Sequence, residues 1–153
     1  MRTIEATQAA AGWRVAVVVS KYNDFVTDRL QTGALAALAN AGVTDITVIK
    51  VPGAFEISLA AHEAAATRTF QAVVCLGCLI RGATAHFEYI ASAVSHGITA
   101  AASATGVPIT FGVLTTNSVE EAIERAGDGP SNKGWEAAVA AVEMASVIAQ
   151  LKS

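Results

Sequence analysis

Four short apolar segments, separated by stretches with helical periodicity, constrain the fold of this chain more than any other feature. They are WRVAVVVS at residues 13–20, DITVIKV at 45–51, AVVCLGCLI at 72–80 and PITFGVL at 108–114. Strands that read as near-continuous apolar runs are buried on both faces, which is typical of a parallel sheet covered by helices. We therefore predict one α/β domain over residues 1–153, a three-layer α/β/α sandwich with a four-stranded parallel sheet, flavodoxin-like in general architecture.

The predicted helices alternate with these strands, because apolar residues between the strands recur at helical spacing. We expect helices at residues 26–41, 54–68, about 84–105, 119–125 and 133–151. Gly42 and Gly106 are expected to end the first and the third of these helices, and Ser118 is expected to cap the fourth. The weakly patterned residues before the first strand, 1–12, are interpreted as an N-terminal arm that becomes ordered only against a neighbouring subunit.

The composition indicates an oligomer. Charged residues make up 15% of the chain, against about 25% in an average soluble domain. Such a surface is covered either by lipid or by other subunits. The longest apolar run, residues 72–80, is far shorter than the ~20 residues of a membrane-spanning helix. We therefore predict a cytoplasmic homo-oligomer with no membrane partner, and the net charge of −3 with no basic run argues against a nucleic-acid partner.

Several familiar cofactor and redox motifs are absent. Cys75 and Cys78 form a C-x-x-C inside a predicted strand, where residues three apart point to opposite faces and cannot form a disulfide. No second Cys/His pair follows that would complete a zinc site. There is also no G-x-G-x-x-G after the first strand, no Walker A loop and no G-x-S-x-G. We predict chemistry that needs neither a metal nor a cofactor.

Unusual residue choices gather where the predicted strands end, which is where open α/β sheets bind their ligands. The four segments are SKYND, VPGAFE, IRGATAH and LTTNS. In the third, the N–H groups of Gly82, Ala83 and Thr84 precede a predicted helix, and such groups bind anions. The alternative is an ordinary threonine cap with nothing bound.

Three further side chains at these strand ends are candidates for a site. His86 lies in the first turn of a predicted helix, where the charged imidazolium is disfavoured, so it suits a proton shuttle. The alternative is a half-buried histidine packed under Phe87 and Tyr89. Glu56 either complements a helix dipole or accepts hydrogen bonds from a polyol. Tyr22 either stacks on a flat heterocycle or simply packs.

Two cations and two further histidines are less informative. Arg125 ends a predicted helix, where a cation is favourable whatever its function, whereas Lys133 begins one, where a cation is unfavourable. Lys133 is therefore the more suggestive of the two. His62 and His96 lie within predicted helices, away from the strand ends, and are interpreted as structural or surface groups.

The quoted segments are similar to those of a known family. VPGAFEI, LGCLIRGATAHFEYI, GVLTTNS, ERAG and NKGWEAAVAAVEMA are long, ordered and correctly spaced. On these residues the chain resembles the 6,7-dimethyl-8-ribityllumazine synthases of riboflavin biosynthesis, from about residue 15 to residue 148. The resemblance implies a transferase that condenses 5-amino-6-(ribitylamino)uracil with 3,4-dihydroxy-2-butanone 4-phosphate, releasing phosphate and water without a metal or redox cofactor.

The resemblance also implies the site residues. His86 matches the proton-transfer histidine. Tyr22 stands where the family usually has Phe or Trp stacked on the pyrimidine. Groups matching those that bind the pyrimidine and its ribityl chain are Tyr22, Ala54, Phe55, Glu56, Cys78, Leu79 and Ile80, and groups matching those that bind phosphate are Ala83, Thr84 and Arg125. Phe111, Arg125 and Lys133 match groups that the adjacent subunit supplies.

The resemblance implies a homo-pentamer, and the short loop GDGPSNKG is similar to that of members whose pentamers assemble into an icosahedral shell. Two alternatives stay open. One is an archaeal-type riboflavin synthase, which dismutates the lumazine product. The other is a non-catalytic shell protein that binds lumazine or flavin, although His86, Thr84 and Arg125 argue against it because a pure binder has no need of the histidine.

Overall fold

The computed structural model describes residues 1–153, in which strands and helices alternate along the chain. The strands are β1 (Arg14–Ser20), β2 (Asp45–Val51), β3 (Ala72–Ile80) and β4 (Ile109–Thr116). The helices are α1 (Asp24–Asn40), α2 (Ile57–Ala66), α3 (His86–Thr105), α4 (Val119–Arg125) and α5 (Lys133–Leu151), with a short 3₁₀ turn η1 (Ala54–Glu56) before α2.

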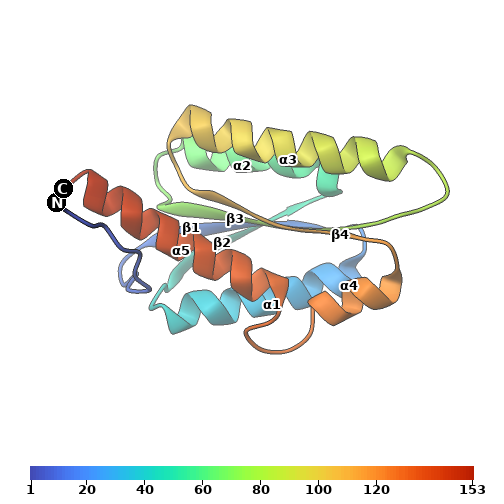
Figure 1. The fold of residues 1–153 in the computed structure, drawn as a ribbon, viewed down its shortest axis with the longest axis horizontal. Coiled ribbons are helices and arrows are strands. Elements are labelled where there is room, and N and C mark those ends of the chain that lie inside the picture. Colours follow the sequence, from blue (N-terminus) through green and yellow to red (C-terminus); the bar gives the residue numbers. More distant parts are fainter.

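The four strands form one parallel sheet in the order β2-β1-β3-β4. Helices α2 and α3 cover one face of the sheet, while α1, α4 and α5 cover the other (Figure 1). The predicted three-layer α/β/α sandwich is therefore confirmed. In this order β2 and β4 are the edge strands, so one side of β4 has no strand partner.

The core consists of two hydrophobic clusters, one on each face of the sheet. Successive residues of β1 alternate between them: Val17 belongs to the cluster under α1 and α5, and Val18 to the cluster under α2 and α3. Both residues are fully buried. Because β1 is enclosed by strands on both sides and by helices on both faces, neither set of side chains meets water, and residues 15–19 are all apolar.

The two cysteines of the C-x-x-C lie in opposite core clusters, as the strand geometry predicted. Both thiols are free and buried. Burial raises the pKa of the Cys75 thiol to about 12 and that of Cys78 to about 11, because the thiolate loses its hydration. Both thiols therefore stay protonated and pack in the core, and they do not act as a redox pair.

Some boundaries of the elements differ from the sequence-based expectation. The helix expected over residues 54–68 begins as the 3₁₀ turn η1 and ends at Ala66, and Arg68 adopts a positive φ of 62°. The helix expected from about residue 84 begins at His86. Here the Thr84 hydroxyl accepts a hydrogen bond from the His86 N–H at 3.4 Å. Thr84 therefore closes a short turn before the helix, a conformation that competes with helix formation.

The predicted helix ends are confirmed where a specific residue was named. Gly106 ends α3 with a φ of 72°, in the left-handed region that glycine adopts without strain. Ser118 caps α4, since its hydroxyl accepts a hydrogen bond from the Glu121 N–H at 3.1 Å. None of the helices combines the length and the apolar character that crossing a membrane requires.

The N-terminal residues before β1 lie along α5 of the same chain. The Thr7 N–H donates to the Ser146 hydroxyl at 2.9 Å, and the Gln8 side-chain amide donates to the Val139 carbonyl at 3.0 Å. Ala10 is fully buried. These contacts anchor the segment along α5 of its own chain, so the expectation that the arm becomes ordered only against a neighbour is wrong.

Candidate active site

A cavity of about 730 Å³ opens at the carboxyl ends of β1, β2 and β3. We call it the strand-end cavity. It brings together most of the site residues that the sequence suggested, from segments far apart in the chain. Its lining residues are Tyr22, Asn23, Pro52, Gly53, Ala54, Phe55, Glu56, Cys78, Leu79, Ile80, Gly82, Thr84, His86, Phe87, Tyr89 and Ile90. Ala83, which was predicted to bind phosphate, is exposed between Gly82 and Thr84 but does not line it.

Asn23 joins two walls of the strand-end cavity. It caps α1 in the left-handed conformation, with a φ of 63°, which asparagine tolerates better than most residues. Its side-chain amide donates to the Cys78 carbonyl at 2.9 Å. Sequence reasoning did not single out Asn23, although it lies in the SKYND segment. The bond ties the end of β1 to the end of β3, so the two segments hold a fixed separation.

Aromatic rings stand at the mouth of the cavity with large exposed surfaces. Tyr22 is 72% exposed, Phe55 61% and Tyr89 76%. Exposed rings of this size mark a surface that another molecule covers. The same mouth carries an exposed carboxylate, since Glu56 lies over Gly53, where an added β-carbon would be 3.2 Å from its Oε1. The mouth therefore presents faces for stacking and a hydrogen-bond acceptor side by side.

His86 lies on the first turn of α3, and its side chain is exposed in the strand-end cavity. Tyr89 is also exposed, so the alternative of a half-buried histidine beneath Phe87 and Tyr89 does not describe the structure. The ring makes no hydrogen bond within the chain. It is therefore placed to exchange a proton with a molecule in the cavity.

Arg81 holds the turn before His86 in place. Its Nε donates to Asn117 Oδ1 at 3.0 Å, and its guanidinium pairs with Glu88 and lies 4.6 Å from the centre of the Phe87 ring. The pKa of Glu88 is lowered by a hydrogen bond from its own backbone N–H and then by Arg81. Arg81 thus bridges α3 and the loop after β4, on either side of the exposed residues 82–85. We did not predict this role from the sequence.

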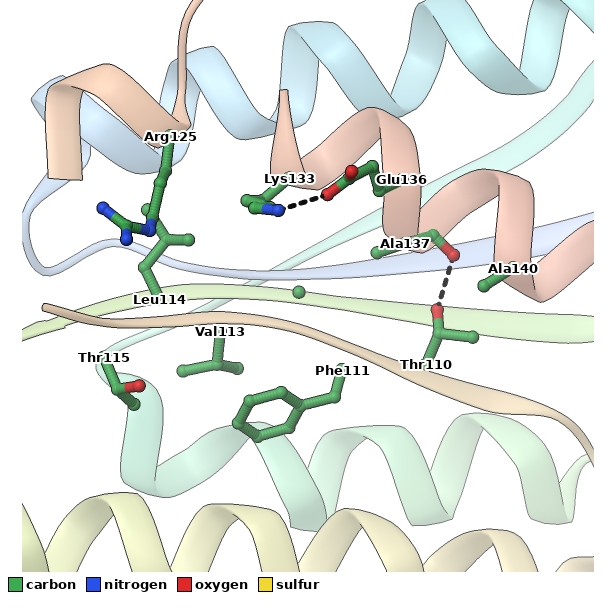
Figure 2. A pocket seen from close by; sticks show the side chains of 11 residues that line it. Thr110, Phe111, Val113, Leu114, Thr115, Arg125, Lys133, Glu136, Ala137 and Ala140 are labelled. Atoms are coloured by element: carbon green, nitrogen blue, oxygen red, sulfur yellow. Dashed lines mark hydrogen bonds and ion pairs between the residues drawn. The ribbon is translucent and has the colours of Figure 1, made fainter. Parts of the chain in front are cut away.

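A second cavity of about 450 Å³ lies along the partnerless edge of β4. We call it the edge cavity. It contains the three residues that the resemblance assigned to an adjacent subunit. Phe111 lies on one side of β4, and Arg125 and Lys133 lie on the other (Figure 2). The remaining lining residues are Thr110, Gly112, Val113, Leu114, Thr115, Glu136, Ala137 and Ala140.

Each cation of the edge cavity has a carboxylate partner in its own chain. Arg125 Nη1 lies 3.3 Å from a carboxylate oxygen of Glu121, and Lys133 Nζ lies 2.7 Å from Glu136 Oε2. The second pair explains how a cation is tolerated at the start of α5, because Glu136 is one turn further on. Both pairs are partly exposed, so they are weak and an incoming anion can displace them. Sequence reasoning missed Glu136.

The structure therefore divides the predicted site residues between two places. The strand-end cavity holds His86 and the groups suited to a flat ring and a polyol, and the edge cavity holds Phe111, Arg125 and Lys133. Neither cavity contains both His86 and Arg125. His62 and His96 line neither cavity, and no group of three or more His, Cys, Asp or Glu side chains is arranged to hold a metal ion.

Comparison with known proteins places this geometry in a family. Residues 12–149 match the family model described as 6,7-dimethyl-8-ribityllumazine synthase. A protein of that name from Syntrophus aciditrophicus is 51% identical over 149 residues, covering 96% of this chain and 97% of the relative. Another of that name from Desulfatibacillum aliphaticivorans is 47% identical over 153 residues, covering 99% of both chains. The chain belongs to the 6,7-dimethyl-8-ribityllumazine synthase family.

Proposed function

We propose that the chain is the lumazine synthase of riboflavin biosynthesis, a transferase that joins 5-amino-6-(ribitylamino)uracil to 3,4-dihydroxy-2-butanone 4-phosphate. The proposal rests above all on the exposed His86 in a cavity that also carries aromatic faces and a carboxylate. The names of both relatives agree with it. They do not favour the alternative of an archaeal-type riboflavin synthase.

The strand-end cavity suits the pyrimidine substrate. Tyr22 offers its face for stacking on the ring, and the Glu56 carboxylate accepts hydrogen bonds from the ribityl hydroxyls. The backbone of residues 78–80 lines the inner wall, where its amide groups recognise the polar edge of the ring. These contacts hold the substrate amine beside His86.

The reaction needs proton transfers at each step. The amine of the pyrimidine attacks the carbonyl carbon of the ketone phosphate, and water leaves to give an imine. Phosphate is then eliminated, and the second amine closes the ring with loss of another water. His86 takes up and returns the protons at these nitrogen and oxygen atoms. Holding the two reactants together supplies much of the remaining acceleration.

The phosphate of the second substrate is bound by the turn at Ala83 and Thr84 together with Arg125 of the edge cavity, and Lys133 adds positive charge beside it. We propose that the two cavities meet across a subunit boundary, with the β4 edge of one chain beside the strand-end cavity of its neighbour. The exposed Phe111 and the low charge content of the chain support this arrangement. The proposed assembly is a homo-pentamer, itself part of an icosahedral shell.

The test is to mix the purified protein with the two substrates and follow lumazine formation by its absorbance. We expect a rate well above that of the spontaneous condensation, together with release of inorganic phosphate. A protein that binds the lumazine tightly but does not accelerate its formation would support the second alternative, a non-catalytic shell protein, and contradict the proposal.

A further inference from the structure

We propose that Asn132 is a positioning residue, whose side-chain amide sets the separation of Arg125 and Lys133 in the edge cavity. The inference rests on the proposed function only in taking a phosphate group as the ligand of these two cations. Asn132 itself does not line the edge cavity, so it acts on the ligand only through the residues that it holds.

The Asn132 side chain is 3% exposed, and its amide is fully used in hydrogen bonds. Its Oδ1 accepts from the N–H of Gly134 at 2.7 Å and from that of Trp135 at 3.1 Å. Its Nδ2 donates to the Gly127 carbonyl at 2.9 Å and to the Arg29 carbonyl at 3.1 Å. One amide thus connects α1, the loop after α4 and the first turn of α5.

These partners lie next to the two cations in the chain. Lys133 directly follows Asn132 and is the first residue of α5, and Gly127 follows two residues after Arg125, the last residue of α4. The Oδ1 bonds therefore fix the backbone that carries Lys133, and the Nδ2 bond to Gly127 fixes the backbone just beyond Arg125. The distance between the cations depends on one side chain.

On the side that faces α1, the amide is closely packed. A β-carbon added to Gly33 of α1 would lie 2.3 Å from Asn132 Oδ1, and one added to Gly134 would lie 2.0 Å from the Leu30 carbonyl oxygen. Both distances are shorter than packed atoms permit, so α1 is closely packed against the start of α5 around this amide. Movement of Asn132 toward α1 would require movement of α1.

Helix capping alone does not require asparagine here. Aspartate and serine cap a helix N-terminus about as well, because capping uses only an acceptor oxygen. The two donations to Gly127 and Arg29 need a group with two donor hydrogens, whereas aspartate has none and serine has a single O–H. Substitutions of Asn132 can therefore remove the link to the Arg125 side of the edge cavity while the cap of α5 remains.

The experiment uses the assembled protein and the variants Asn132→Asp and Asn132→Ser. Calorimetry gives the Kd for inorganic phosphate, and initial rates give KM for each substrate. We expect the Kd for inorganic phosphate and the KM for the ketone phosphate to rise about tenfold, because small displacements of charged contacts are costly. We expect the KM for the pyrimidine to change by less than about twofold, since its contacts lie in the other cavity.

Two further variants separate positioning from general stability. Gly33→Ala adds a methyl group on α1 that would clash with the Asn132 side chain. It should therefore raise the Kd for inorganic phosphate, as the Asn132 substitutions do, although Gly33 lies on another element. Val107→Ala removes buried methyl groups before β4 in the opposite core cluster, so it should lower Tm without changing the phosphate Kd. Native mass spectrometry establishes that each variant is assembled as the wild type is.

Several outcomes would overturn the inference. One is a phosphate Kd within about twofold of wild type in the assembled Asn132→Ser protein. Another is an equal rise in KM for both substrates in Asn132→Ser, if Val107→Ala shows the same rise at the same loss of Tm. If Asn132→Asp does not fold, Asn132→Ser and Gly33→Ala decide the question. Failure of the proposed function would give a different result. The wild type would form no lumazine, but the Asn132 variants would still bind inorganic phosphate more weakly than the wild type does.

Discussion

The strand-end cavity and the edge cavity differ in the chemistry that they present. The first exposes aromatic rings, one histidine and one carboxylate, and no lysine or arginine lines it. The second carries Arg125 and Lys133, each paired with a carboxylate of its own chain. A flat, hydroxylated molecule suits the first cavity, and an anion suits the second. Each cavity therefore supplies half of what a two-substrate condensation needs.

The two cavities also differ in how they are held. The strand-end cavity is formed by loops that follow parallel strands, so the register of the sheet largely sets the positions of its residues. The edge cavity is bounded by α4 and α5, and the Asn132 amide joins the loop after α4 to the first turn of α5. A defect in one should therefore leave the other intact, and the following predictions test this independence.

The largest expected effect concerns His86. His86→Ala should lower kcat by about one to two decades, since general acid–base catalysis typically contributes ~10²-fold or more and water replaces part of it. The KM values should change little, because the contacts that bind both substrates remain. Steady-state kinetics on the assembled variant checks this. An unchanged kcat would remove His86 from proton transfer.

Arg125→Ala should act on the other cavity. Charge-assisted hydrogen bonds are worth about 1.5–3 kcal/mol each, so affinity for the ketone phosphate should fall about tenfold or more. Affinity for the pyrimidine should be retained. The measurement is the KM or Kd for each substrate, with Arg29→Ala as a control for loss of an arginine that lines neither cavity. Equal weakening of both substrates would mean that Arg125 supports assembly instead of phosphate binding.

Mixing the two variants tests whether the cavities belong to one site. If His86 and Arg125 meet across a subunit boundary, His86→Ala and Arg125→Ala chains that are unfolded and reassembled together should regain activity. In equal mixtures about one quarter of the interfaces would pair an intact His86 with an intact Arg125. The readout is activity, with mixed assemblies verified by native mass spectrometry. Activity no higher than the average of the two variants would contradict a shared site.

The smallest expected effect is a pH dependence of the Arg81–Glu88 pair, whose carboxylate lies with His86 on the first turn of α3. The folded-state pKa of Glu88 lies below its ordinary value of 4.5. Its stabilising contribution is therefore present above that value and is lost as pH falls through the lower, folded-state pKa. The Tm advantage of wild type over Glu88→Gln should shrink below about pH 4.5, and it should be small because the pair is partly exposed.

A matched variant controls for this measurement. Glu124→Gln removes an exposed carboxylate that has no ion-pair partner, so its Tm difference from wild type should change little over the same pH range. A Tm difference for Glu88→Gln that does not depend on pH would show that the Arg81 pair contributes nothing to the stability of the fold.

Residues with a local pattern were predictable, and residues whose role depends on distant partners were not. The buried strands, the ends of α3 and α4 and the opposite faces of the two cysteines follow from short-range rules of periodicity and capping. The start of α3 was placed two residues early, because the Thr84 hydroxyl forms a turn instead of a cap. Arg81 was missed because its partners Glu88 and Asn117 lie 7 and 36 residues away. Glu136 was missed although Lys133 is only three residues away, so the helical spacing of these opposite charges could have identified the pair.

The sequence by itself determined the α/β class, the parallel sheet and the residues at the strand ends. The central strands β1 and β3 are buried on both faces and therefore contain long apolar runs, whereas the edge strand β2 keeps polar residues at exposed positions. Only the tertiary structure decided which of these residues share a cavity. Asn23 bonds to the Cys78 carbonyl 55 residues away, and Asn132 bonds to the Arg29 carbonyl 103 residues away. Such contacts arise from packing between elements, and packing leaves no periodic signal in the chain.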